Sequence, residues 1–170
     1  MKIFEIVQFD GVDPATEADV SVLESEIGHR LPADYRNFLL TLNGGQTSQG
    51  GIVVHEHPDP HGYVASIRVF YSLSGDAPPY ANFYSTLRSK QFKLPTGHIA
   101  ITDSHGNLVT IDVRDADGPV YYFDHEMPDE SDLDENDVCH YKPKHAIPLA
   151  GNFRELLTRL ANFDPTQDGG

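Results

Sequence analysis

The chain has 170 residues, of which 39% are hydrophobic and 10% are aromatic, so it can bury a core of its own and is not disordered throughout. Its 26 acidic side chains outnumber the 12 basic ones, and the formal net charge is -14. Phosphate backbones and anionic membrane surfaces are therefore poor partners, whereas a basic protein is an electrostatically favourable one.

The first part of the chain predicts a short strand followed by a helix. Residues 3–8 are mostly apolar and include β-branched side chains, which favours a short strand. Thr16, with Asp19 three residues later, forms a capping box that begins a helix. Gly28 ends that helix, because glycine adopts the left-handed conformation at low cost. The face that we expect to be buried carries Val20, Leu23 and Ile27.

A second helix is predicted directly after the first. Pro32 suits its first turn, where the missing N–H costs nothing. One apolar stripe at helical spacing consists of Tyr35, Phe38, Leu39 and Leu42. Asn43-Gly44-Gly45 then ends the helix. We expect residues 15–43 to form a helical hairpin that packs against a sheet.

The hydrophobic period changes to two after residue 51, with one helical interruption. Turn signals at Gly106-Asn107 and Asp117-Gly118 separate the last three expected strands and predict an antiparallel meander. Asn152 is expected to cap a last helix that buries Phe153, Leu156, Leu157 and Leu160. The expected strands are 52–54, 67–71, 98–101, 108–113 and 120–123; residues 79–92 are expected to be a helix and 124–137 an acidic loop.

These elements predict an α+β domain: a central antiparallel sheet with an N-terminal helical hairpin and a C-terminal helix. We expect one domain over residues 1–163 and a frayed tail over 164–170. Cys139 is the only cysteine, so no internal disulfide is possible. The N-terminus lacks the layout of a signal peptide, and no apolar run reaches the length of a membrane span, so we expect a cytoplasmic protein.

Residues 23–45 closely resemble the opening signature of the SUKH superfamily. The segment has a helix that ends at a glycine, followed by Leu31-Pro32, the aromatic and basic pair Tyr35-Arg36, and a final Asn-Gly-Gly. Residues 94–101 and 118–126 resemble the family's sheet region, and 150–157 resemble its terminal helix. The family often has a tryptophan in the sheet or near the first helices, and this chain has none. Tyrosine and phenylalanine can fill the same volume.

The resemblance implies an α+β domain that acts by binding and has no catalytic residues or cofactor. Bacterial members of the family are typically immunity proteins that neutralise polymorphic toxins, including nucleases, and fungal members are scaffolds. We therefore expect an immunity protein whose partner is a toxin domain, with a scaffold or regulatory interaction module as the alternative. We expect it to bind neither nucleic acid nor membrane.

Three histidines in a short segment are candidate metal ligands. In an extended chain His55 and His57 would lie on the same side, and His61 follows closely. Two prolines in this segment indicate a loop rather than the rigid element that zinc sites usually use. A solvated loop that holds no metal is the favoured interpretation.

The acidic segment at 124–137 has two interpretations, a solvated loop or a surface for a basic toxin. It lacks the glycine at the sixth position that a calcium-binding EF-hand turn requires. In the second interpretation its carboxylates would pair with arginine and lysine of the toxin. The candidate partner-binding residues are Asp124, Glu126, Asp129, Glu130, Asp132 and Asp134.

Other polar pairs give little sign of catalysis. Asp124-His125-Glu126 and Ser104-His105 lack the surroundings of a nucleophile elbow. Cys139 follows acidic residues, which raise the pKa of a thiol and disfavour the reactive thiolate. We expect no enzyme activity.

Overall fold

A computed structural model describes residues 9–10, 13–47, 50–58, 63–73 and 92–164. Two helices, α1 (Glu17–Ile27) and α2 (Ala33–Thr41), form the predicted N-terminal hairpin. The capping box is confirmed: the Asp19 N–H donates to Thr16 Oγ1 at 3.2 Å, and Asp19 accepts from the Thr16 N–H at 2.8 Å. Gly28 ends α1 at φ 74°. Tyr35, Phe38 and Leu39 of α2 are fully buried, as the stripe predicts.

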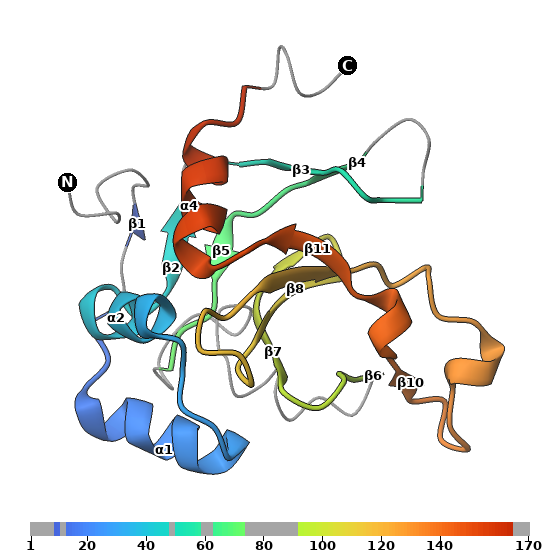
Figure 1. Cartoon of the computed structure of the whole chain (residues 1–170), viewed down its shortest axis with the longest axis horizontal. Coiled ribbons are helices and arrows are strands. Elements are labelled where there is room, and N and C mark those ends of the chain that lie inside the picture. Colours follow the sequence, from blue (N-terminus) through green and yellow to red (C-terminus); the bar gives the residue numbers. More distant parts are fainter. Residues whose placement is uncertain (1–8, 11–12, 48–49, 59–62, 74–91, 165–170) are drawn as a thin grey trace.

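Seven strands form one antiparallel sheet whose spatial order follows the chain (Figure 1). The meander predicted from the turn signals is confirmed, since β7 pairs with β8 and β8 with β9. The strands, in spatial order, are β1 (Phe9–Asp10), β2 (Gly45–Thr47), β5 (Val69–Phe70), β7 (His98–Ser104), β8 (Asn107–Asp112), β9 (Val120–Phe123) and β11 (Ile147–Ala150).

Two small sheets and two short helices complete the described fold. β3 (Ile52–Val54) pairs antiparallel with β4 (Tyr63–Ala65), and β6 (Phe92–Lys93) pairs parallel with β10 (Cys139–His140). The 3-10 helices are η3 (Glu130–Asp132) and η4 (Pro143–His145). The parallel pair joins segments far apart in the sequence, which local patterning does not reveal.

The C-terminal helix α4 (Phe153–Ala161) and α2 share one aromatic cluster. The ring of Phe153 lies 4.9 Å from that of Phe38 and 5.8 Å from that of Phe70 on β5, measured between centroids. All four apolar side chains predicted for α4 are buried, and Asn152 caps the helix by accepting from the Glu155 N–H. Elsewhere in the core, the ring of Phe123 on β9 packs against that of Tyr141, with 5.3 Å between the centroids. The α+β architecture is confirmed.

Several predicted elements differ in extent or lie outside the described residues. The strand predicted over 67–71 covers only Val69–Phe70. The strand at 3–8 lies outside the described residues, and so does the helix at 79–92 except for Phe92, which begins β6. Only Asp164 of the predicted tail is described. Within the described residues, no helix combines the length and the apolar character needed to span a membrane.

Candidate functional site

The acidic region, residues 124–137, projects from the side of the sheet and is anchored by its own side chains (Figure 1). Asp129 and Asp132 form a capping box around η3. Asp132 is buried, forms an ion pair with Lys142, and lies 3.4 Å from His145 Nε2. The hydrogen bond from Lys142 lowers the pKa of Asp132 to about 2. The segment is therefore a loop with a short helix, fastened to the body at Asp132.

Asp124, at the start of this region, is also turned inward. It is 6% exposed, and its Oδ2 lies 2.8 Å from Nε2 of His57. Its Oδ1 accepts from the Glu126 N–H at 2.8 Å. Asp124 thus joins the end of β9 to the turn after β3, and its carboxylate is engaged within the chain.

The remaining predicted partner-binding carboxylates are at least partly open to solvent. Glu126, Asp129 and Glu130 lie at the surface, and Asp134 is half-buried. Asp134 accepts from the backbone N–H groups of Asn136 at 2.9 Å and Val138 at 3.1 Å. Its Oδ2 also lies 3.1 Å from Nε2 of His140. These contacts lower the pKa of Asp134, that with Asn136 most and that with His140 next. The six candidates therefore divide into two inward and four outward carboxylates, and whether they bind a partner stays a prediction.

His55 and His57 do not lie along an extended strand. Residues 55–56 form a turn, His55 is exposed, and His57 points toward Asp124 and stacks on the ring of Tyr63 at 4.7 Å. His61 lies outside the described residues. The part of the chain that the structure describes contains no group of three or more side chains arranged to hold a metal ion. The turn removes the geometric argument for pairing His55 with His57.

Asn107 is the centre of a polar network that the sequence does not reveal. Its amide donates to the hydroxyls of Tyr63 and Tyr122, and its Oδ1 accepts from the His125 N–H at 2.8 Å. Burial raises the pKa of the Tyr122 hydroxyl. The sequence predicts Asn107 only as a turn residue. In the structure it also connects β4, β8 and β9.

The residues weighed for catalysis have structural partners. Ser104 Oγ accepts from the Ser66 N–H at 2.9 Å, and the neighbouring His105 is exposed. His125 is exposed, and its Nδ1 lies 3.8 Å from Asp124 Oδ1. Burial raises the pKa of the Cys139 thiol, and the charge of Asp132 adds to this, in the direction expected from the nearby acids. A thiolate at Cys139 is therefore disfavoured.

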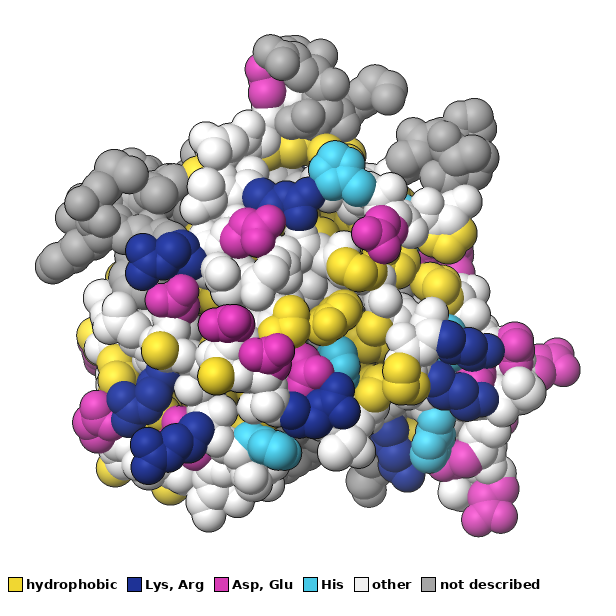
Figure 2. All heavy atoms as spheres, in the orientation of Figure 1, with side chains coloured by type: hydrophobic (Ala, Val, Ile, Leu, Met, Phe, Trp, Pro, Cys, Tyr) yellow, Lys and Arg dark blue, Asp and Glu magenta, His cyan; other side chains and the backbone are white. Residues whose placement is uncertain are grey.

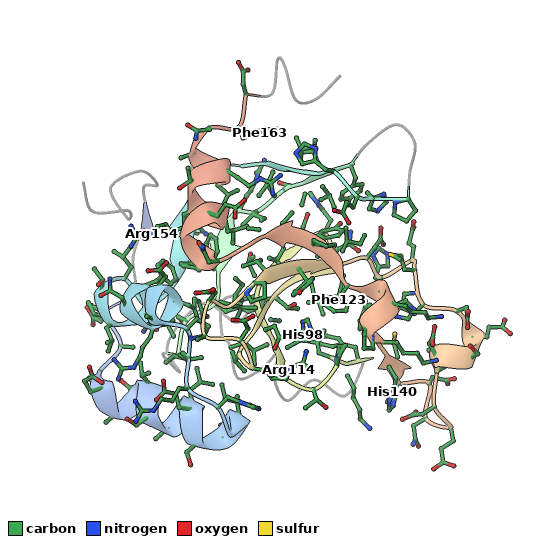
Figure 3. The ribbon with its side chains drawn as sticks, in the orientation of Figure 1. His98, Arg114, Phe123, His140, Arg154 and Phe163 are labelled. Carbon is green, nitrogen blue, oxygen red and sulfur yellow. The ribbon has the colours of Figure 1, made fainter. Side chains whose placement is uncertain are left out.

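His98 on β7 lies next to an ion pair between Arg114 and Asp112. Arg114 donates through Nε and Nη2 to the two oxygens of Asp112 at 2.9 and 2.6 Å. His98 Nδ1 is 3.1 Å from Thr110 Oγ1, and burial lowers the pKa of its imidazole. Figure 3 shows His98 and Arg114 near each other below the centre of the sheet. The neutral imidazole is the form that this position favours.

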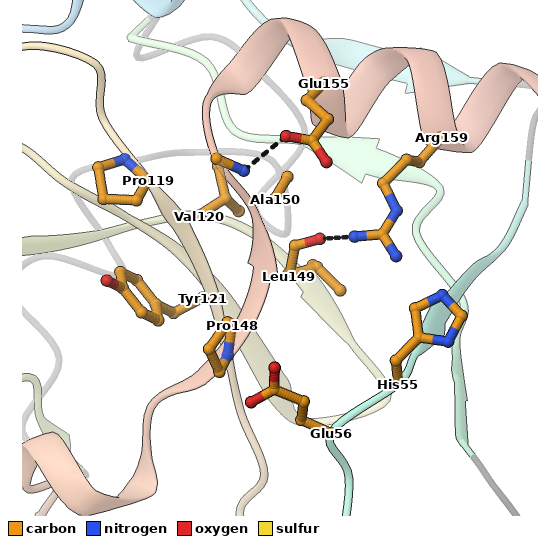
Figure 4. Close-up of a pocket in the computed structure, with 11 residues that line it drawn as sticks. His55, Glu56, Pro119, Val120, Tyr121, Pro148, Leu149, Ala150, Glu155 and Arg159 are labelled. Atoms are coloured by element: carbon orange, nitrogen blue, oxygen red, sulfur yellow. Dashed lines mark hydrogen bonds between the residues drawn. The ribbon is translucent and has the colours of Figure 1, made fainter.

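A groove of about 330 Å³ runs beside β11, the last strand of the seven-stranded sheet (Figure 4). At its α4 end Arg159 donates to the Leu149 carbonyl, and Glu155 accepts from the Gly151 N–H at 2.8 Å. Figure 2 shows hydrophobic side chains gathered near the centre of this face, with acidic, basic and histidine side chains around them. The groove is lined by His55, Glu56, Pro119, Val120, Tyr121, Pro148, Leu149, Ala150, Gly151, Glu155 and Arg159.

Comparison with known proteins identifies a family over most of the chain. A family model described as the SMI1 / KNR4 family (SUKH-1) matches residues 14–159. The match begins just before α1 and ends within α4, so it contains the hairpin, the acidic region and the groove. No curated protein matches the chain.

Proposed function

The chain belongs to the SMI1/KNR4 family (SUKH-1), and from this premise we propose that it is an immunity protein that binds and neutralises a basic toxin domain. The family consists in general of non-catalytic immunity and regulatory domains, so protein binding is its common activity. We propose that the present chain acts in the cytoplasm, occludes the toxin and performs no chemistry on it.

The anchored acidic region is the observation that carries this proposal. Glu126, Asp129, Glu130 and Asp134 face outward from a segment that Asp132 fastens to Lys142. A surface that is already ordered loses less conformational entropy on binding than a mobile one. Carboxylates held at the rim speed the encounter with a basic partner, and a net charge of -14 adds a long-range field of the same sign.

Co-expression with any toxin domain that a neighbouring gene encodes tests the proposal. The toxin domain is expressed in a bacterial host with and without this chain, and survival is counted. We expect the host to survive only when the chain is present. Purified toxin domain and chain should also form a complex on a sizing column. A complex without protection would favour the scaffold alternative, and the absence of both would overturn the proposal.

A further inference from the structure

The groove beside β11 has an apolar floor. Tyr121 comes from β9, Pro119 immediately precedes that strand, and Pro148 comes from β11. Pro148 is exposed, and Pro119 and Tyr121 are half-buried, so part of this surface is open to a partner. A volume of about 330 Å³ is at the low end of the range of about 300–1,000 Å³ for ligand pockets. It is suited to one anchoring side chain and not to a large ligand.

One carboxylate of the groove is available to a ligand. Glu56, in the turn after β3, is exposed and forms no ion pair or hydrogen bond with another described residue. Glu155, by contrast, accepts a hydrogen bond from the Gly151 N–H, and Arg159 donates one to the Leu149 carbonyl. Figure 4 shows Glu56 at the end of the groove away from Glu155. At the α4 end the charges of Glu155 and Arg159 offset each other, so the Glu56 end is the part of the groove that attracts a cation.

We propose that this groove binds an arginine side chain presented by a protein partner. The guanidinium pairs with Glu56, and its planar face and aliphatic stem lie on Tyr121 and Pro148. The inference rests on the proposed function and deepens it, since it names the side chain that the partner presents. It also adds a second contact surface, separate from the acidic region.

Arginine is favoured over the other occupants on physical grounds. Its guanidinium is planar and weakly hydrated, so it can stack on an aromatic ring and pair with a carboxylate at the same time. The ammonium of lysine is compact and strongly hydrated, and gains less from the apolar floor. Strand addition to β11 is disfavoured, because Pro148 has no N–H and Arg159 already occupies the Leu149 carbonyl.

Titration with short peptides tests the groove without a toxin. The probes are acetyl-Gly-Arg-Gly-amide, its lysine analogue and its citrulline analogue, which has the shape of arginine without the charge. Binding is followed by amide chemical shifts of the full chain. We expect the arginine peptide to shift the amide signals of residues 55–56, 120–121 and 149–151, and the citrulline peptide to shift none of them measurably.

Matched variants connect the binding to Glu56 and Tyr121. Glu56→Gln should weaken the arginine peptide about tenfold, because it loses a charge-assisted hydrogen bond. Tyr121→Leu, which keeps an apolar floor, should weaken it about threefold. Asp13→Asn removes one exposed charge outside the groove and should leave binding unchanged. Thermal unfolding of each variant shows that it is folded.

Two results would overturn the arginine site. One is an arginine peptide that shifts none of these residues, and the other is a Glu56→Gln variant that binds as tightly as Asp13→Asn. In the toxin assay, a Glu56→Gln variant that protects fully and binds the toxin with unchanged affinity would show that the groove takes no part in toxin binding. The proposed immunity function would still stand. Peptide binding that is lost with Glu56→Gln, combined with no protection by the native chain, would support the groove and reject the immunity function.

Discussion

Gly118, in the turn between β8 and β9, lies so close to Pro32, before α2, that a Cβ at position 118 would be 2.7 Å from Pro32 Cβ. Gly118 also has φ 63°, where side chains are disfavoured. This contact fastens the N-terminal hairpin to the meander.

Gly118→Ala is therefore predicted to destabilise the fold more than Gly28→Ala. Gly28 has φ 74°, but a Cβ at that position would meet no atom within 4 Å, so its substitution costs backbone strain alone, about 1 kcal/mol. Gly118→Ala has the same backbone strain and also overlaps Pro32, which should lower the free energy of unfolding by about 1–3 kcal/mol more. Urea unfolding of both variants measures the difference. Equal losses would show that Pro32 moves aside freely.

Stability is predicted to fall as the pH drops below about 6.5, the usual pKa of an unfolded histidine. Burial lowers the pKa of His145, and also that of His98. The unfolded chain therefore binds protons first on acidification, so this stability is complete above that pH and declines below it. Urea midpoints at about pH 7.5 and about pH 5.5 measure the decline.

His145→Gln is expected to show a smaller decline than the native chain, because it removes one buried imidazole that resists protonation. His29→Gln changes an exposed histidine and is the control. A decline as steep in His145→Gln as in the His29→Gln control would assign the pH dependence to other groups.

Neutralising the outward carboxylates is predicted to slow toxin association. The variant combines Glu126→Gln, Asp129→Asn, Glu130→Gln and Asp134→Asn, which keep the side-chain acceptors that cap η3 and the turn after it. At low salt the association rate should fall about tenfold. The native rate should itself decrease as salt rises, because charges act over only about 10 Å at 0.1 M.

Dissociation should change little in this variant, since rim charges act mainly on encounter. Asp124 and Asp132 are left intact, because their carboxylates are buried and paired within the chain. Equal association rates for variant and native chain would remove the acidic region from the mechanism and leave solubility as its role.

Arg159→Ala is predicted to destabilise the chain by about 1–3 kcal/mol, because the Leu149 carbonyl at the sheet edge loses its donor. Arg154→Ala, on the same helix, removes only an exposed pair with Asp34 at 3.3 Å and should cost less than about 1 kcal/mol. Chemical unfolding compares the two. The Arg159 variant should also self-associate more at high concentration in light scattering, as an uncovered strand edge does. A ranking in the opposite order would contradict this account of β11.

Removal of metal is predicted to leave stability unchanged. Thermal unfolding with and without a chelator should coincide, since an ion that binds the native state would raise its unfolding temperature. A loss of several degrees with chelator, restored by zinc, would instead support a site at His55, His57 and His61.

Local signals predict the described helices well, because their determinants lie within a few residues. The Thr16–Asp19 capping box, Gly28 and the four apolar side chains of α4 act over one or two helical turns. The meander is equally accessible from the sequence, since its turns are short.

The site is less predictable, because its contacts join distant segments. Asp129 and Asp132 are alike in sequence, yet only Asp132 reaches Lys142 and becomes buried. Asn107 bonds to Tyr63, 44 residues away, and the groove draws residues from β9, β11, α4 and the turn after β3. No periodicity or short motif carries information about such encounters.

The sequential order of the large sheet makes its strand pairing independent of the length of its connections. Each strand of the large sheet pairs with the strands that come before and after it in the sheet's chain order. The smaller elements lie as side excursions in the connections between these strands: β3 and β4 between β2 and β5, β6 between β5 and β7, and η3, β10 and η4 between β9 and β11. Two of these connections are joined where β6 pairs with β10. Lengthening or rewriting one excursion changes no strand pairing of the large sheet, and loop closure grows only slowly in cost with length. Glu56 and the outward carboxylates belong to two different excursions. The two excursions meet at the His57–Asp124 contact, so a change that keeps both of these residues can alter one recognition element while retaining the other.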